Sequence, residues 1–128
     1  MTTVVAAVIE RGGRVLIGQR KAGGWHSLKW EFPGGKVEVR ETPEDAAARE
    51  LEEELAIRAR VDREIMRYEY QYPERAPILL IFYRIVDFDG EPRNLDYEQI
   101  RWELKERLRD YDFLEGDAAF IRSYSGGS

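Results

Sequence analysis

The sequence contains no cysteine and only one histidine, His26. Disulfides, thiol nucleophiles, zinc sites of cysteine and histidine, and metal sites with two histidines are therefore excluded. The longest apolar run, Ile78 to Tyr83, is far shorter than the roughly 20 residues of a membrane-spanning helix. Met1 to Arg11 lacks the layout of a signal peptide. We therefore expect a cytoplasmic protein without a membrane partner, in which any catalysis uses carboxylates.

Positive charge is also scarce, because 20 Lys and Arg stand against 25 Asp and Glu, for a formal net charge of -5. This balance disfavours binding to a nucleic-acid polymer through bulk charge, and no obligate protein partner is evident. With 128 residues, 43% of them hydrophobic, the chain is expected to form one domain over residues 1–128. Its tail, residues 125–128, is expected to be flexible.

Runs of branched and aromatic residues, separated by segments with Gly or Pro, predict the strands. The expected strands are 3–9 and 15–17, joined as a hairpin; 58–72; 78–86, buried on both faces; and 99–102. Loops are expected at 21–29 and 88–95, and helical segments at 103–108 and 116–124.

The clearest helix signal runs from Thr42 to about Ala56. Thr42 suits the N-cap and Pro43 the first helical position, and the interior consists almost entirely of Ala, Leu, Glu and Arg. A helix is therefore predicted here.

Three glutamates of this helix, Glu50, Glu53 and Glu54, lie within an arc of about 100°. Like charges on one face repel each other unless a cation or arginines lie opposite. Oxygen ligands favour hard cations, so the pattern indicates Mg²⁺, with Mn²⁺ as a substitute, and a phosphate-containing substrate. A solvated acidic face is the alternative, since glutamate is a good helix former.

The helix and the residues before it resemble the Nudix box, whose pattern is G-x5-E-x7-R-E-U-x-E-E-x-G-U with U aliphatic. The matching residues are Gly35, Glu41, Arg49, Glu50, Leu51, Glu53, Glu54 and Ile57. Ala56 stands where the box has its second glycine. A left-handed backbone costs a non-glycine residue only about 1 kcal/mol, so the chemistry is expected to survive this change.

The resemblance extends over nearly the whole chain, to MutT-type nucleoside triphosphate pyrophosphohydrolases and their CTP-cleaving relatives. The segment from Trp30 to Lys36, a tyrosine-rich strand, an apolar strand and an acidic segment before Trp102 carry it. It implies an α/β class and the Nudix fold, an α/β/α sandwich with a central mixed sheet. It also implies hydrolysis of a nucleoside triphosphate to a nucleoside monophosphate and pyrophosphate.

The resemblance assigns metal binding to Glu50, Glu53, Glu54 and the carbonyl of Gly34, with Glu50 and Glu53 also counted as catalytic. Arg49 would act beside them by orienting a carboxylate, either Glu53 or Glu41.

A further acidic residue, in the loop before Trp102, would act as a base or an additional metal ligand. Asp96, six residues before Trp102, matches this position best. Glu98 is the rival residue.

Substrate contacts are implied for Arg20, Lys36 and Arg75, at the phosphates or the base, and for Phe32 and Tyr72, beside the base. Each also has an ordinary interpretation, because surface Lys and Arg are common and aromatic residues commonly fill cores.

Asp117 lies where MutT-type 8-oxoguanine enzymes carry an asparagine. An ionised Asp only accepts hydrogen bonds, whereas a protonated Asp imitates Asn by donating as well. The alternative role for Asp117 is to cap the last helix.

The leading functional hypothesis is an Mg²⁺-dependent pyrophosphohydrolase that removes oxidised nucleotides such as 8-oxo-dGTP, a role related to DNA repair. The alternative is a pyrophosphohydrolase for CTP or dCTP. A third hypothesis, from another class, is a Nudix-fold module that binds nucleotides without turning them over.

Overall fold

The computed structural model describes residues 1–126. These residues form β-strands, two α-helices and two 3₁₀ helices. In chain order these are β1 (Thr2–Arg11), β2 (Arg14–Gln19), β3 (Trp30–Glu31), β4 (Gly34–Lys36), α1 (Pro43–Leu55), β5 (Arg58–Tyr70), β6 (Ile78–Asp89), β7 (Gln99–Leu104), η1 (Lys105–Asp110), η2 (Glu115–Asp117) and α2 (Ala118–Ser125).

Strand β1 holds the sheet together, because it pairs with three other strands. It runs parallel to β6 and antiparallel to β2 and β4. The main path of the sheet is β3-β2-β1-β6-β5, and β7 pairs with β2. The sheet is therefore mixed, as the sequence predicts.

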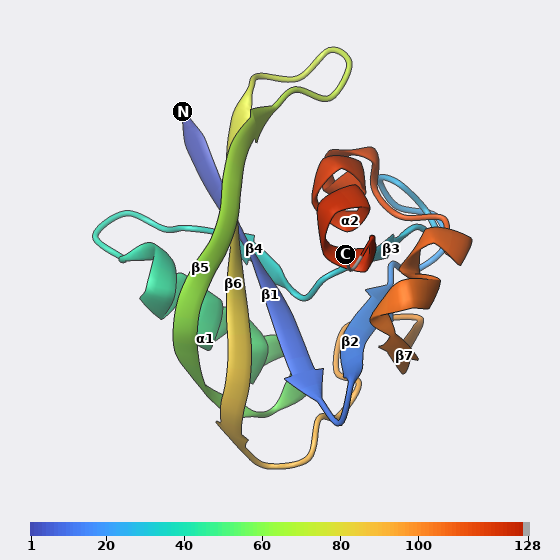
Figure 1. Ribbon diagram of the computed structural model, residues 1–128. Helices are drawn as coiled ribbons and strands as arrows, with labels where there is room; N and C mark the ends of the chain where they lie inside the picture. The colour runs from blue at the N-terminus through green and yellow to red at the C-terminus, as the bar shows by residue number, and fades with distance from the viewer. Residues whose placement is uncertain (127–128) are drawn as a thin grey trace.

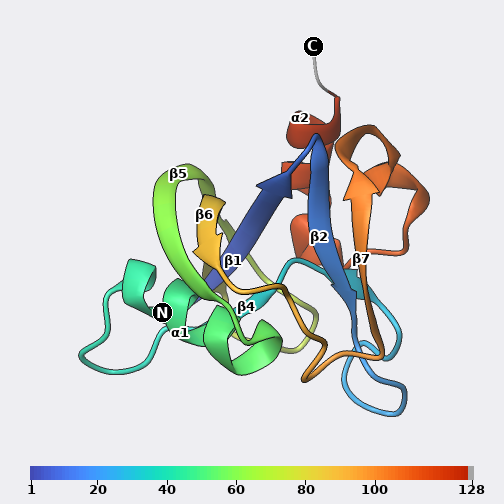
Figure 2. The ribbon, with the colours of Figure 1, turned by 90° about the horizontal axis from the view of Figure 1, so that it is seen from below.

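Alternate residues of β1 face the two helices, which lie on opposite sides of the sheet (Figures 1 and 2). Val5 packs with the buried alanines of α1, while Ala7 and Ile9 pack with its leucines. Ala6 and Val8 belong to a separate cluster that includes residues of α2. Because β1 is buried on both faces, the predicted α/β/α sandwich is confirmed.

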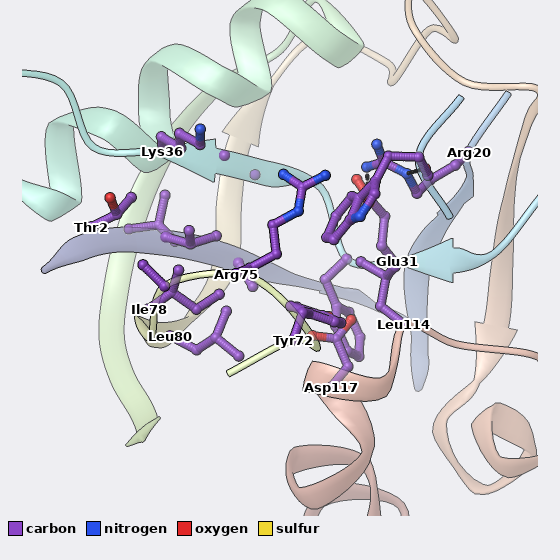
Figure 3. A pocket seen from close by; sticks show the side chains of 18 residues that line it. Thr2, Arg20, Glu31, Lys36, Tyr72, Arg75, Ile78, Leu80, Leu114 and Asp117 are labelled. Atoms are coloured by element: carbon purple, nitrogen blue, oxygen red, sulfur yellow. Dashed lines mark hydrogen bonds and ion pairs between the residues drawn. The ribbon is translucent and has the colours of Figure 1, made fainter. Parts of the chain in front are cut away.

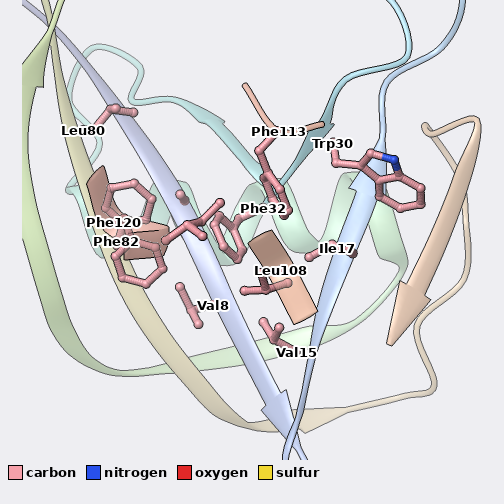
Figure 4. Close-up of a cluster of buried hydrophobic side chains, with 12 residues drawn as sticks. Val8, Val15, Ile17, Trp30, Phe32, Leu80, Phe82, Leu108, Phe113 and Phe120 are labelled. Atoms are coloured by element: carbon pink, nitrogen blue, oxygen red, sulfur yellow. The ribbon is translucent and has the colours of Figure 1, made fainter. Parts of the chain in front are cut away.

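Aromatic rings fill the layer between the sheet and α2 (Figure 4). Phe82 of β6 stacks on Phe120 of α2, with ring centroids 4.2 Å apart. The edge of Phe32 meets both rings. These contacts fix the N-terminal end of α2, and with it Asp117, against the sheet.

Helix α1 begins and ends where the sequence predicts. The Thr42 hydroxyl accepts a hydrogen bond of 3.1 Å from the Asp45 amide. Ala56 adopts the left-handed conformation at φ 58°, and its amide donates to the Glu52 carbonyl. The helix therefore keeps the end that a glycine normally makes.

Strand β6 continues to Asp89, so the loop predicted at 88–95 begins too early. Phe88 and Asp89 pair with Ala59 and Arg58 of β5. Arg60 forms cross-strand ion pairs with Asp87 and Asp89, and these stabilise the end of β6, whose sequence is no longer apolar there.

The end of β5 and the C-terminal region also differ from the prediction. β5 ends at Tyr70, which leaves Tyr72 outside the strand. Residues 103 and 104 extend β7, and 3₁₀ turns replace α-helix at 105–110 and 115–117.

Ser125 is not part of a flexible tail, because it is buried at the end of α2. Its hydroxyl donates to the Ile121 carbonyl and accepts from Arg109. Residues 127 and 128 lie outside the described residues. Within residues 1–126, no helix is both long enough and apolar enough to cross a membrane.

Candidate active site

Arg49 is the centre of an ion-pair network on α1. Its guanidinium forms a two-pronged pair with Glu41, at 2.7 and 3.0 Å, and donates to the Lys36 carbonyl at 3.1 Å. The same group reaches Glu50 at 2.9 Å and Glu53 at 3.3 Å. Arg49 therefore contacts both carboxylates between which the sequence left the choice open, with the stronger geometry at Glu41.

Glu50 and Glu54 lie together on the inner side of α1. Burial, with the neighbouring Glu50 carboxylate, raises the pKa of Glu54 to about 9. A Cβ on Gly35 would lie 2.6 Å from the Glu50 carboxyl group, so any larger residue at this position would displace that group. Two close carboxylates without a cation between them form a site that favours binding of positive charge.

Glu53 departs from this pair, since its side chain is 59% exposed and turned to Arg49. Glu54 is 8% exposed, and its Oε1 accepts from the Gly34 amide at 3.2 Å. In the described part of the chain, no three acidic or histidine side chains are arranged to hold a metal ion. The three glutamates share one helix face, but Glu53 turns to Arg49 while Glu50 and Glu54 stay close to each other.

A cavity of about 450 Å³ begins beside these residues and ends at α2 (Figure 3). All six residues predicted to contact substrate line it, together with Gly34 and Gly35, the first glycine of the box. The six are Arg20, Phe32, Lys36, Tyr72, Arg75 and Asp117. In Figure 3, Lys36 lies at one end, Asp117 and Tyr72 at the other, and Arg75 between them.

Asp117 occupies the N-cap position of α2, yet its side chain makes no capping hydrogen bond. It is 5% exposed and lines the cavity. Burial raises the pKa of Asp117 well above its usual range, and the Glu31 carboxylate adds to the effect. Burial therefore favours the neutral form of the carboxyl group, which is both a donor and an acceptor.

Glu31 is a cavity residue that sequence reasoning missed. It pairs with Arg20 at 2.8 Å and receives the Tyr97 hydroxyl at 3.3 Å. Burial raises its pKa, although Arg20 opposes this. The sequence signal that could have identified Glu31 is its place as a charged residue between two aromatic residues, Trp30 and Phe32, both of which are buried.

The two acidic residues proposed for the loop differ in their surroundings. Both Asp96 and Glu98 are exposed. The Asp96 charge contributes to the raised pKa of Glu31, so the two carboxyl groups are within electrostatic reach of each other, although Asp96 does not line the cavity. Glu98 is tied to the neighbouring strand by its amide, which donates to the Gln19 carbonyl at 2.8 Å.

An aromatic group borders the same cavity. Trp25 lies under the guanidinium groups of Arg20 and Arg75, which are 5.5 and 5.1 Å from its ring. His26 is half-buried against Trp25 and Tyr72. Burial lowers the pKa of His26, so this ring is neutral at pH 7.

Comparison with known proteins gives a consistent result. A model of the NUDIX domain family matches residues 1–124. The chain is 34% identical to the CTP pyrophosphohydrolase of Escherichia coli K12, over 97% of this chain and 91% of that protein. It is 36% identical to the 8-oxo-dGTP diphosphatase of Haemophilus influenzae, over 91% of this chain and 87% of that protein.

A solved structure supports the same family. The solution structure of the E. coli ORF135 protein superposes with a TM-score of 0.88 at 33% identity, covering 98% of this chain and 89% of that one. The crystal structure of a MutT NUDIX hydrolase from Burkholderia pseudomallei superposes with a TM-score of 0.82 at 27% identity, covering 94% of this chain and 95% of that one, which confirms the expected Nudix fold. The chain belongs to the NUDIX domain family, and it is a Nudix hydrolase.

Proposed function

We propose that this protein is an Mg²⁺-dependent nucleoside triphosphate pyrophosphohydrolase that acts on oxidised nucleotides such as 8-oxo-dGTP. One observation carries the proposal: a single cavity connects Gly34 and Gly35 to the buried Asp117, whose raised pKa favours the neutral carboxyl group. A triphosphate near the box and a base near α2 fit into one such space. Lys36 at one end offers a positive charge to the phosphates, and Asp117 at the other end offers hydrogen bonds to the base.

Asp117 supports the choice of base. A neutral carboxyl group donates from its O–H and accepts at its carbonyl oxygen. Guanine presents two acceptors, N7 and O6, on its major-groove edge. In 8-oxoguanine, N7 carries a hydrogen and becomes a donor, so this edge offers a donor beside an acceptor. Neutral Asp117 complements that edge and leaves an acceptor opposed to an acceptor in unmodified guanine.

Nudix hydrolases generally use divalent metal ions, and the residues present here fit such an ion. Glu50 and Glu54 would hold it, with Glu53 and the Gly34 carbonyl as further ligands. Their oxygen-only donor set favours Mg²⁺, for which Mn²⁺ substitutes. When bound, the ion neutralises charge on the phosphates.

The proposed reaction is (d)NTP plus water giving (d)NMP plus pyrophosphate. A water oxygen bonds to the inner phosphorus, and the bond from that phosphorus to the bridging oxygen breaks. The bridging oxygen leaves with pyrophosphate, and Asp96 accepts the proton of the water. Lys36 and Arg75 neutralise phosphate charge from the cavity wall. The expected cytoplasmic location agrees with this substrate.

A second candidate is hydrolysis of CTP or dCTP, which the same residue supports. Neutral Asp117 donates to the N3 acceptor of cytosine and accepts from its N4 amino group. The likeness to a CTP pyrophosphohydrolase adds support. A binding module without turnover has less support, since every box carboxylate is present.

The test is pyrophosphate release from canonical and oxidised (d)NTPs with Mg²⁺, compared as kcat/KM. We expect 8-oxo-dGTP to exceed dGTP by at least about 100-fold, as for a well-discriminated hydrogen-bond pattern. Glu53→Gln is the inactive reference, and Glu52→Gln, exposed on the same helix, is its matched control. Preference for cytosine nucleotides would select the second candidate, and no turnover on any nucleotide would refute both.

A further inference from the structure

Tyr97 lies outside the box, yet its hydroxyl contacts both Glu54 of α1 and Glu31 in the wall of the cavity. The side chain is 5% exposed. Its hydroxyl lies 2.7 Å from Oε1 of Glu54 and 3.3 Å from Oε2 of Glu31. A phenol has one hydrogen to donate, so the shorter contact makes Glu54 its principal acceptor.

Two residues fix the Tyr97 ring and backbone. The side-chain amide of Asn94 binds both sides of the Tyr97 backbone, accepting from its N–H at 2.8 Å and donating to its carbonyl at 2.8 Å. On the other side, Gly18 of β2 lies directly against the ring. A Cβ at that position would approach the ring atoms to 2.7 Å, so any other residue displaces the phenol.

The segment that carries Tyr97 is also attached to the C-terminal end of α1. The Arg93 amide donates to the Leu55 carbonyl at 2.9 Å, and the Leu95 amide donates to the Glu54 carbonyl at 3.1 Å. Both carbonyls belong to the last turn, where helix carbonyls lack partners within the helix. Glu54 is thus held by its backbone through Leu95 and by its side chain through Tyr97.

Both donors to the Glu54 carboxylate use the same oxygen. Oε1 accepts from the Tyr97 hydroxyl and from the Gly34 amide. Within residues 1–126, no backbone amide, hydroxyl or basic side chain donates to Oε2, and the Glu50 carboxyl group is the acidic neighbour of Glu54. The carboxylate is therefore held in one orientation with its second oxygen available to a cation.

We propose that Tyr97 is a positioning residue that orients the Glu54 carboxylate for a divalent cation. It also sets the distance between that carboxylate and Glu31 in the cavity wall. This inference rests on the proposed function in one respect, namely that a cation binds at Glu54. Groups that orient a metal ligand typically change metal affinity or activity by about 10- to 100-fold when removed.

The test compares Tyr97→Phe with the wild type and measures Mn²⁺ binding to the nucleotide-free protein, by the electron paramagnetic resonance signal of free Mn²⁺. Tyr97→Phe deletes only the hydroxyl, and we expect its Kd for Mn²⁺ to rise by about tenfold. In turnover assays, the Mg²⁺ concentration for half-maximal rate should rise by a similar factor. Tyr111→Phe is the matched control, because the Tyr111 hydroxyl also bonds a glutamate, Glu103, away from the cavity.

Gly18→Ala provides a second route to the same result, since it displaces the ring without altering any polar group. Thermal unfolding shows that each variant is folded, and a rise in the Mn²⁺ Kd with Gly18→Ala supports the proposal even if Tyr97→Phe does not fold. Equal Mn²⁺ affinity in the folded variants and wild type overturns it, as does a wild type that binds no Mn²⁺. A wild type that binds Mn²⁺ but hydrolyses no nucleotide refutes the proposed function alone, and the Mn²⁺ comparison still decides the role of Tyr97.

Discussion

Ala56 holds a backbone conformation that its side chain opposes. Its φ of 58° lies in the left-handed region, where a side chain costs about 1–2 kcal/mol relative to glycine. The resemblance to the box identified this position, and the structure shows that the turn is kept without the glycine. The free energy of unfolding is therefore lower than it would be with glycine at this position.

We expect Ala56→Gly to stabilise the protein by about 0.5–1 kcal/mol, after the greater entropy of glycine in the unfolded chain is subtracted. The midpoint of thermal unfolding should rise by about 2–5 °C, with turnover unchanged. Ala48→Gly, in the middle of the same helix, is the control and should lower the midpoint. A lower midpoint for Ala56→Gly would contradict this account.

Asp117 gives stability a pH dependence whose sign is fixed by its raised pKa. The folded protein keeps a proton on this group at pH values where the unfolded chain has lost it. Stability is therefore lost as pH rises above about 4, the pKa in the unfolded chain, until the folded-state pKa is reached.

Asp117→Asn removes this titration while keeping a donor and an acceptor. The stability of the variant relative to wild type should grow by about 1.4 kcal/mol per pH unit above pH 4, as long as wild-type Asp117 keeps its proton. Urea unfolding at pH 5 and pH 7 measures the difference. A constant difference would show that Asp117 is already ionised at pH 5.

At single residues, positions and contacts were predictable where a motif was informative. The contacts of Arg49 with Glu41 and Glu53 follow from a fixed spacing, and the place of Asp117 in the cavity wall follows from a match to a known position. Glu31 and Tyr97 could not, because their roles depend on contacts with Glu54 and Arg20 that form only when distant segments meet. The direction in which each glutamate side chain of α1 points likewise depends on Arg49 and on burial. Positions around a helix axis do not reveal either of them.

At the level of elements, α1 was predictable because its signals are local. Its cap, its first-position proline and its composition all lie within the helix itself. The strands β3 and β4 have two and three residues, too few for any periodicity, and exist because β2 and β1 pair with them. The end of β6 was missed because its pairing there uses charged residues.

The N-cap of α1 offers a direct measurement at this scale. Thr42→Ala removes the acceptor for the Asp45 amide and should lower the free energy of unfolding by about 1 kcal/mol. Thr42→Ser retains the hydroxyl and should remain close to wild type. If the two variants unfold alike in urea, the cap contributes nothing to the helix.

At the level of the whole molecule, the cavity forms where distant segments meet: β1, β3, β4 and β6 contribute to its wall, and Leu114 and Asp117 line it just before α2. Phe120 attaches α2 to the sheet by stacking on Phe82, and its amide donates to the Tyr68 hydroxyl at 3.3 Å. Asp117 is held only as firmly as this helix. The general sandwich could be predicted from the resemblance, whereas these ring contacts could not.

Phe120→Ala should lower the free energy of unfolding by about 3–5 kcal/mol, because a fully buried aromatic ring is lost. Selectivity between bases should fall together with stability, since Asp117 shifts with α2. Phe120→Leu fills part of the space and should retain most of the selectivity. A stable Phe120→Ala variant with unchanged selectivity would show that α2 does not depend on this ring.

The parallel pairing of β1 with β6 has a consequence for how the protein is made. Val5 lies opposite Ile81, and Ile9 opposite Ile85, so β1 leaves the ribosome well before the parallel partner with which it pairs. At about 5–20 residues per second, this delay lasts several seconds. Throughout that time β1 has an open edge and two apolar faces. We therefore expect the yield of active protein in the cell to depend on protection of the nascent chain as well as on the stability of the finished domain.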